Sequence, residues 1–272
     1  MTTTDTRVSR SLDVPGARLR YQVRGTGPLL VVIGSPMTSA EFVPVAHALA
    51  GDHTVVTYDP RGLGGSTIED PAQDATPDLR ADDVAAIIDA LDAGPADVFG
   101  SSGGAVTGLA LVTRHPDRVR TLIAHEPPLT ELVPEAEQQR AAVEEIIETF
   151  HQDGPAAAWM KFMANAGLDL DHETGPPPGP EPSPEQQAQQ SARFFDHELR
   201  LTTGYRPEIE ALRAARVIIG VGVGSRPLLT YRTSHALAAL IGVTPVDFPD
   251  GHTGFMSAPG AFATRIRDVL GH

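Results

Sequence analysis

The sequence predicts an α/β protein in which helices cover both faces of a mostly parallel, doubly wound sheet. Two observations lead to this prediction, and a third limits what can hold the fold together. Short apolar runs alternate with longer amphipathic stretches, as strands and helices do when they follow one another. From about residue 127 to residue 213 helical stretches succeed one another without a strand between them, which indicates an insertion. The 272 residues include no cysteine, so the fold depends on neither disulfides nor thiolate-bound metal.

The part of the chain before the insertion predicts alternating strands and helices. Residues 18–24 (RLRYQVR) alternate between apolar and polar, which is typical of an early antiparallel strand. Residues 29–33 (LLVVI) are continuously apolar and fit a strand buried on both faces. The elements expected next are a helix at 39–50, a strand at 54–58, a helix at 77–93, a strand at 97–99, a helix at 105–115 and a strand at 119–125.

The second part of the chain predicts a helical cap and then a return to the sheet. The expected cap helices are 134–150, 155–166 and 184–199, and the segment 175–184 is too rich in proline for a helix or a strand ladder. Strands at 217–221 and 244–248, a helix at 231–242 and a last helix near 259–270 complete the sheet. The predicted division is a core of residues 1–127 and 214–272, with the cap of residues 128–213 inserted after the sixth strand.

Composition excludes several classes of function. Asp and Glu number 35 against 21 Lys and Arg, and the net charge of −14 argues against nucleic acid as a partner. Lys161 is the only lysine, so no phosphate-binding loop ending in lysine is present, and the glycine spacings do not match a dinucleotide site. No apolar stretch has the length of a membrane span, and residues 1–10 do not resemble a secretory signal. We therefore expect a cytoplasmic enzyme without a metal or cofactor and without a membrane partner. A homodimer is compatible with the sequence.

The segment Gly100-Ser-Ser-Gly-Gly104 carries the clearest chemical signal. It fits G-x-S-x-G between a predicted strand and a predicted helix, and this frame selects Ser102. Such a turn exposes the central hydroxyl at a strand tip and at a helix N-terminus, where the amides favour developing negative charge. We therefore expect Ser102 to be a nucleophile.

A serine nucleophile needs a base and a group that orients the base. His252 lies in the loop between the last strand and the last helix, where a catalytic base is required. For the acid, Glu126 directly follows the strand 119–125, at the same edge of the sheet as Ser102. The alternatives are Asp250, two residues before His252, or a Ser–His pair without an acid.

The oxyanion hole and the pocket are expected around these residues. The backbone N–H of Gly103 and that of Ser35 are the expected donors, since Pro36 has no N–H. The apolar residues near the presumed site and in the cap predict a pocket for a small, largely apolar molecule. The candidates for substrate contact are Met37, Trp159, Phe162 and Phe255.

These motifs resemble the α/β-hydrolase fold superfamily over nearly the whole chain, and most of all its small cap-bearing bacterial serine members. The matching pieces are Gly34-Ser35-Pro36, Asp59–Ser66, the turn around Ser102 and Asp250-Gly-His252. The resemblance implies a structural role for the loop 59–66, in which Asp59 and Arg61 can pair. Some members carry the acid where Glu126 stands. Two features depart from the pattern: Ile33 replaces a common histidine, and the commoner position of the acid is vacant.

Taken together, the residues and the resemblance predict a serine hydrolase that acts on an ester, thioester or lactone. A second hypothesis keeps the site but assigns non-hydrolytic chemistry, such as C–C bond formation, cyclisation or a lyase reaction in secondary metabolism. A third treats the pocket as a receptor without catalysis. The Ser102 and His252 pair argues against this third hypothesis.

Overall fold

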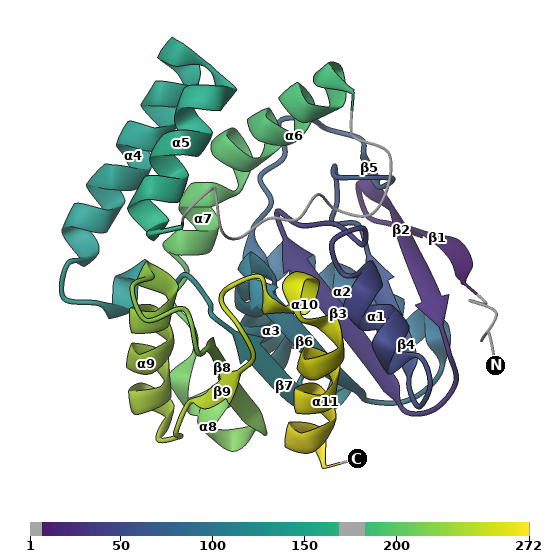
Figure 1. Cartoon of the computed structure of the whole chain (residues 1–272). Helices are drawn as coiled ribbons and strands as arrows, with labels where there is room; N and C mark the ends of the chain where they lie inside the picture. The colour runs from purple at the N-terminus through teal and green to yellow at the C-terminus, as the bar shows by residue number, and fades with distance from the viewer. Residues whose placement is uncertain (1–6, 169–182, 272) are drawn as a thin grey trace.

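The computed structural model describes residues 7–168 and 183–271 (Figure 1). Most of the proline-rich segment 175–184 therefore lies outside the described residues. The strands are β1 (Val8–Val14), β2 (Ala17–Arg24), β3 (Leu29–Ser35), β4 (Thr54–Tyr58), β5 (Thr67–Ile68), β6 (Ala96–Ser102), β7 (Val119–His125), β8 (Val217–Gly222) and β9 (Val246–Phe248). The α-helices are α1 (Val43–Leu49), α2 (Pro77–Leu91), α3 (Gly103–Arg114), α4 (Ala136–Asp153), α5 (Pro155–Ala166), α6 (Pro184–His197), α7 (Leu199–Thr203), α8 (Ile209–Ala214), α9 (Leu229–Ile241), α10 (Gly254–Ser257) and α11 (Pro259–Leu270).

The strands form one sheet in the order β1-β2-β4-β3-β6-β7-β8-β9, with β5 paired to β2. Strand β2 runs antiparallel to β1 and to β4, whereas the pairs from β4 to β9 are parallel. The mostly parallel α/β sheet predicted from the sequence is thus confirmed. Because the strands from β3 to β8 run the same way, their carboxyl ends meet at one edge of the sheet.

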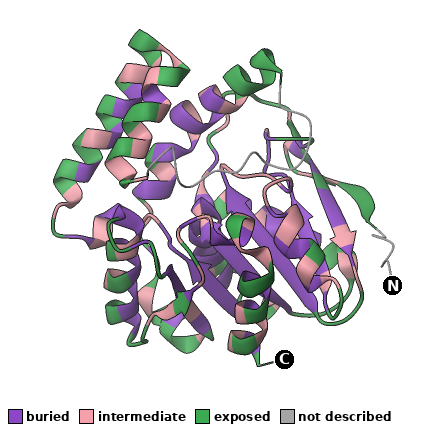
Figure 2. Cartoon of the chain, viewed as in Figure 1, coloured by how far each residue is buried: buried purple, intermediate pink, exposed green. Residues whose placement is uncertain are grey.

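Two apolar layers hold helices on the two faces of the sheet. Helices α2, α3, α8 and α9 pack on one face, and α1, α10 and α11 pack on the other. Strand β3 is buried along its whole length because both layers cover it, which explains its unbroken apolar sequence. In Figure 2 the centre of the sheet is buried, and exposed residues lie on the outer helix surfaces.

Helices α4 to α7, which follow β7 and precede β8 in the chain, form a separate layer that we call the cap (Figure 1). The cap has an apolar core of its own, formed by Val143, Ile146, Ile147, Ala158, Phe194, Phe195 and Leu199. It leaves the sheet after β7, which is the seventh strand in chain order. The cap was expected after the sixth strand; the sequence patterns identify five strands before it, and the exposed strand β1 and the two-residue strand β5 bring the number to seven.

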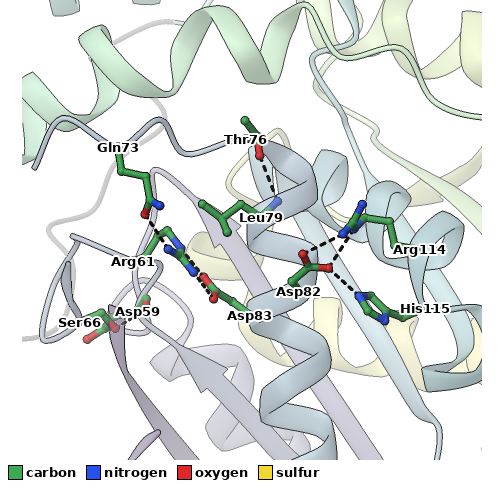
Figure 3. Close-up of polar contacts among 10 residues, drawn as sticks. All are labelled: Asp59, Arg61, Ser66, Gln73, Thr76, Leu79, Asp82, Asp83, Arg114 and His115. Carbon is green, nitrogen blue, oxygen red and sulfur yellow. Dashed lines mark hydrogen bonds and ion pairs between the residues drawn. The ribbon is translucent and has the colours of Figure 1, made fainter. Parts of the chain in front are cut away.

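The loop of residues 59–66 is held by a buried ion pair that differs from the expected one. Arg61 donates to Asp83 of α2, with Nε to Oδ2 at 2.8 Å and Nη2 to Oδ1 at 2.5 Å, rather than pairing with Asp59 (Figure 3). The Asp59 carboxylate instead accepts the backbone N–H of Ser39 at 2.9 Å and that of Gly65 at 2.8 Å. At Gly64 φ is +54°, and a Cβ there would lie 2.7 Å from Asp59, so glycine is required.

None of the helices in the two described ranges combines the length and the apolar character that crossing a bilayer requires.

Candidate functional site

The nucleophile candidate Ser102 stands at the junction of β6 and α3. Its φ of 55° and ψ of −124° lie outside the conformations that L-residues usually adopt, and its side chain makes no capping hydrogen bond to the helix. The other six residues of β6 are buried, whereas Ser102 is partly exposed. This backbone turn therefore presents the hydroxyl of Ser102 at the carboxyl edge of the sheet, as the motif predicts.

The turn at Ser102 requires glycine at position 104, because helix α3 packs directly against the backbone of β3 at this point. A Cβ on Gly104 would lie 2.3 Å from the carbonyl oxygen of Ile33 and 2.6 Å from Cα of Gly34. Such contacts with backbone atoms cannot be relieved by a rotamer change. The glycine after Gly103 in the motif thus brings the N-terminus of α3 against the end of β3.

His252 and Glu126 come together at the same edge, although 126 positions separate them in the chain. Nδ1 of His252 lies 2.5 Å from Oε2 of Glu126, within a charge-assisted hydrogen bond. Glu126 follows β7 with φ of 52° and is fully buried, and His252 is 7% exposed in the loop after β9. Because Nδ1 faces the carboxylate, Nε2 is the nitrogen left for proton exchange.

Further donors keep the Glu126 carboxylate ionised. Oε1 accepts the backbone N–H of Gly222 at 2.7 Å, and Oε2 also accepts the hydroxyl of Thr230 at 3.1 Å. Burial raises the pKa of Glu126, but the hydrogen bond and the charge of His252 outweigh burial, so that the pKa is lowered to about 2. At neutral pH the carboxylate is therefore charged and can stabilise a protonated imidazole.

Asp250, the alternative acid, is placed differently. Its side chain is exposed, and its Oδ2 accepts the hydroxyl of Ser257 at 2.5 Å. Of the two acids weighed from the sequence, the structure brings Glu126 to His252.

Ser35 and Gly103, the expected oxyanion donors, are close neighbours. Ser35 is paired with Ser102 across the β3–β6 ladder, and a Cβ on Gly103 would lie 2.8 Å from the carbonyl oxygen of Ser35. Gly103 is the first residue of α3, a helix of 12 residues, so its amide has no partner within the helix. The two residues flank the position of the Ser102 side chain.

A cavity of about 330 Å³ lies between the cap and this edge of the sheet, and Ser35, Ser102, Gly103 and His252 all line it. Its cap wall is mainly apolar. Trp159 and Phe194 stack with ring centroids 4.9 Å apart, and Phe162 packs edge-on to both rings. Met37, Trp159 and Phe162, which the sequence suggests as candidates for substrate contact, line this cavity.

Phe255 is a correction to the predicted pocket. It is fully buried and stacks on Phe42 with ring centroids 4.7 Å apart, in the layer that carries α1 and α11. The short helix α10 turns its neighbour Met256 toward the cavity instead. Sequence spacing alone could not separate these adjacent residues, because the helix begins only at Gly254.

Two buried polar residues near the site were not singled out from the sequence. Glu198, at the junction of α6 and α7, lines the cavity and is 1% exposed. Its partner Arg80 lies on α2, where the amphipathic pattern gave no sign of burial, and Arg80 Nη1 donates to Glu198 Oε1 at 2.6 Å. No short-range pattern links positions 118 residues apart, so only the fold reveals this pair.

The chain is similar to known proteins over nearly its whole length. A family model described as alpha/beta hydrolase fold matches residues 27–158. The chain is 32% identical over 267 residues to "Uncharacterized hydrolase YraK" of Bacillus subtilis, covering 96% of this chain and 95% of that protein. The chain belongs to the alpha/beta hydrolase fold family. Within this family it is an enzyme of the hydrolase type.

Two further matches, one by sequence and one by structure, are also hydrolases. The zearalenone hydrolase of Bionectria ochroleuca is 32% identical over 127 residues, which cover 45% of this chain and 48% of that protein. The crystal structure of a hydrolase from Pseudomonas aeruginosa PA01 superposes with a TM-score of 0.74 at 23% identity, covering 97% and 98% of the two chains. The latter likeness concerns the fold alone.

Proposed function

We propose that this alpha/beta hydrolase is a serine hydrolase that cleaves an ester, thioester or lactone of a small, largely apolar molecule. The observation that carries the proposal is the 2.5 Å contact between His252 and Glu126 beside a cavity that Ser102 also lines. A serine hydroxyl becomes a good nucleophile when an oriented imidazole accepts its proton.

In the proposed reaction Ser102 Oγ attacks the carbonyl carbon, and its proton passes to Nε2 of His252. The charged Glu126 stabilises the imidazolium, while the N–H groups of Ser35 and Gly103 bind the oxyanion of the tetrahedral intermediate. Collapse of the intermediate breaks the bond to the leaving alcohol or thiol, which takes the proton from His252. Water, deprotonated by the same nitrogen, then attacks the acyl group and releases the acid and Ser102.

The character of the cavity supports the proposed class of substrate. Its volume of about 330 Å³ suits a small molecule, and aromatic side chains form the cap wall. The protein carries a net charge of −14, which disfavours an anionic substrate. A neutral acyl compound with an apolar or ring-shaped body therefore fits best.

The test compares Ser102→Ala with Ser101→Ala, using p-nitrophenyl butyrate as the substrate. Ser101 is a matched control because it is adjacent but fully buried, with its Oγ 3.3 Å from Nδ1 of His125. We expect Ser102→Ala to lose hydrolysis and labelling by a fluorophosphonate, and Ser101→Ala to keep both. Unchanged turnover in Ser102→Ala would refute the proposal. If Ser102→Ala keeps activity on a physiological substrate and His252→Ala loses it, the non-hydrolytic hypothesis takes its place.

A further inference from the structure

A buried cluster of three residues joins the cap to the expected oxyanion loop. Glu198 belongs to the cap, Arg80 to helix α2 and Ser35 to the end of β3, and each is at most 2% exposed. Arg80 Nη1 donates to Glu198 Oε1 at 2.6 Å and to the Ser35 hydroxyl at 2.5 Å. The Ser35 hydroxyl in turn donates to the same oxygen of Glu198. The cap thus contacts the side chain of Ser35 through a single carboxylate oxygen.

The guanidinium of Arg80 remains charged in this buried environment. Burial lowers the pKa of Arg80, but the charge and the hydrogen bond of Glu198 outweigh burial and raise that pKa above its usual value. Oε2 of Glu198 and two guanidinium nitrogens of Arg80, Nε and Nη2, find no partner among the described residues. Apolar side chains of similar volume would join the cap to the core without this desolvation cost. We therefore expect the Arg80–Glu198 pair to have a role besides joining the cap to the core.

Ser35 is the residue on which the cluster acts. Its backbone is fixed on one side by the ladder to Ser102, and its carbonyl oxygen lies 2.8 Å from where a Cβ on Gly103 would be. Its side chain is fixed on the other side by Arg80 and Glu198. The direction of the Ser35 N–H consequently depends on the position of a cap residue.

We propose that Glu198 is a positioning residue, which with Arg80 holds Ser35 so that its N–H points at the carbonyl oxygen of the substrate. This inference rests on the serine hydrolase mechanism proposed above. It makes the oxyanion hole complete only when the cap is seated on the core. The negative charge of Glu198 beside a developing oxyanion is balanced by Arg80, so the cluster positions the donor without repelling the intermediate.

The test measures kcat and KM for hydrolysis of p-nitrophenyl butyrate. It also measures the inhibition constant of phenylboronic acid, which forms a tetrahedral adduct with a serine hydroxyl. In Glu198→Gln the neutral amide oxygen is a weaker acceptor for Arg80 and the Ser35 hydroxyl than the carboxylate oxygen, so the oxyanion donor is held less firmly. We expect kcat to fall at least about 10-fold with KM within about threefold, because a displaced oxyanion donor weakens only the transition state. The inhibition constant of phenylboronic acid should rise by the same factor as kcat falls. Ser35→Ala keeps the backbone N–H but removes the contact with Glu198, so it should show the same change.

The double variant Glu198→Gln/Ser35→Ala identifies the route of the effect. If Glu198 acts through the Ser35 hydroxyl, the double variant loses no more than either single variant; effects that multiply would overturn the inference. Unchanged kcat, or a raised KM at unchanged kcat, would also overturn it. Glu144→Gln is the matched control, because Glu144 pairs with Arg200 on the exposed surface of the cap, and its kcat should equal that of the wild type.

Two further results separate the possible failures. If Glu198→Gln does not fold, Arg80→Met/Glu198→Met replaces the pair with apolar side chains, and kcat should still fall in the folded protein. If Ser102→Ala is inactive while Glu198→Gln or the Met pair has wild-type kcat, only this inference fails. If Ser102→Ala is fully active, the serine mechanism itself fails.

Discussion

Replacement of Glu126 by glutamine tests both the electrostatics and the chemistry of the site. The carboxylate accepts three hydrogen bonds, from Gly222, Thr230 and His252. A glutamine amide has one oxygen, so in either orientation its NH₂ group faces a donor. If the NH₂ faces Nδ1 of His252, the imidazole loses the partner that fixes its tautomer. We expect kcat to fall about 10³- to 10⁴-fold.

The same substitution has a predicted effect on stability. Lowering of the Glu126 pKa from 4.5 to about 2 corresponds to about 3 kcal/mol of folding free energy at neutral pH. Because the folded state binds this proton more weakly than the unfolded state, the stabilisation is present above pH 4.5 and is lost as the pH falls toward 2. Glu126→Gln should therefore be less stable by about 3 kcal/mol at pH 7, and the difference should shrink on acidification.

The assay is urea unfolding followed by circular dichroism at several pH values, combined with steady-state hydrolysis of p-nitrophenyl butyrate. Asp250→Asn is the matched control, because Asp250 is an exposed acid with φ of 65° close to His252, and asparagine tolerates that conformation. Its kcat and its pH dependence of stability should follow the wild type. A constant stability difference between Glu126→Gln and the wild type from pH 7 to 3 would refute the electrostatic argument, and a larger loss of kcat in Asp250→Asn would move the role of acid to that residue.

Three further predictions follow from other parts of the molecule. Burial lowers the pKa of His125 from 6.5 to about 4, so about 3 kcal/mol of the free energy of unfolding should be lost as the pH falls from 6.5 to 4. In His125→Phe this pH dependence, measured by urea unfolding at each pH, should be absent. Trp159→Ala should raise KM for an aromatic ester about 10-fold or more with a smaller change for an acetate ester, because it removes the stacked wall of the cavity; equal KM changes would contradict a role in binding. Gly64→Ala should cost at least about 1 kcal/mol more in thermal unfolding than Gly94→Ala, since both glycines have positive φ but only Gly64 lies against Asp59; equal costs would show that the clash relaxes freely.

Much of the fold could be predicted because its strands are either buried on both faces or bounded by clear turn residues. Strands 54–58 and 119–125 and helix 155–166 occur with the predicted ends. The strand β1 was missed because its side chains are largely exposed and only Leu12 and Val14, at its end, alternate with polar residues and are partly buried. Its pairing with β2 comes from the backbone ladder instead.

The site was predictable where a local motif fixes the geometry, and less so elsewhere. The spacing around Ser102 implies a turn that needs no information from distant residues. The choice between Glu126 and Asp250 depends on which carboxylate reaches His252, and this distance is set by the pairing of β7 with β8 and of β8 with β9. Glu198 could not be predicted, because its burial depends on how the cap packs over α2.

The left-handed backbone at Ser102 and Glu126 has a consequence for evolution and for engineering. At both positions a residue with a side chain occupies a conformation that glycine adopts at little cost. A descendant freed from the need for turnover could gain stability by accepting glycine at Ser102, whereas glycine at Glu126 would also remove a buried carboxylate that accepts three hydrogen bonds. Directed evolution that selects for heat resistance alone would then favour inactive variants at Ser102, so such selections on this scaffold need a simultaneous requirement for activity.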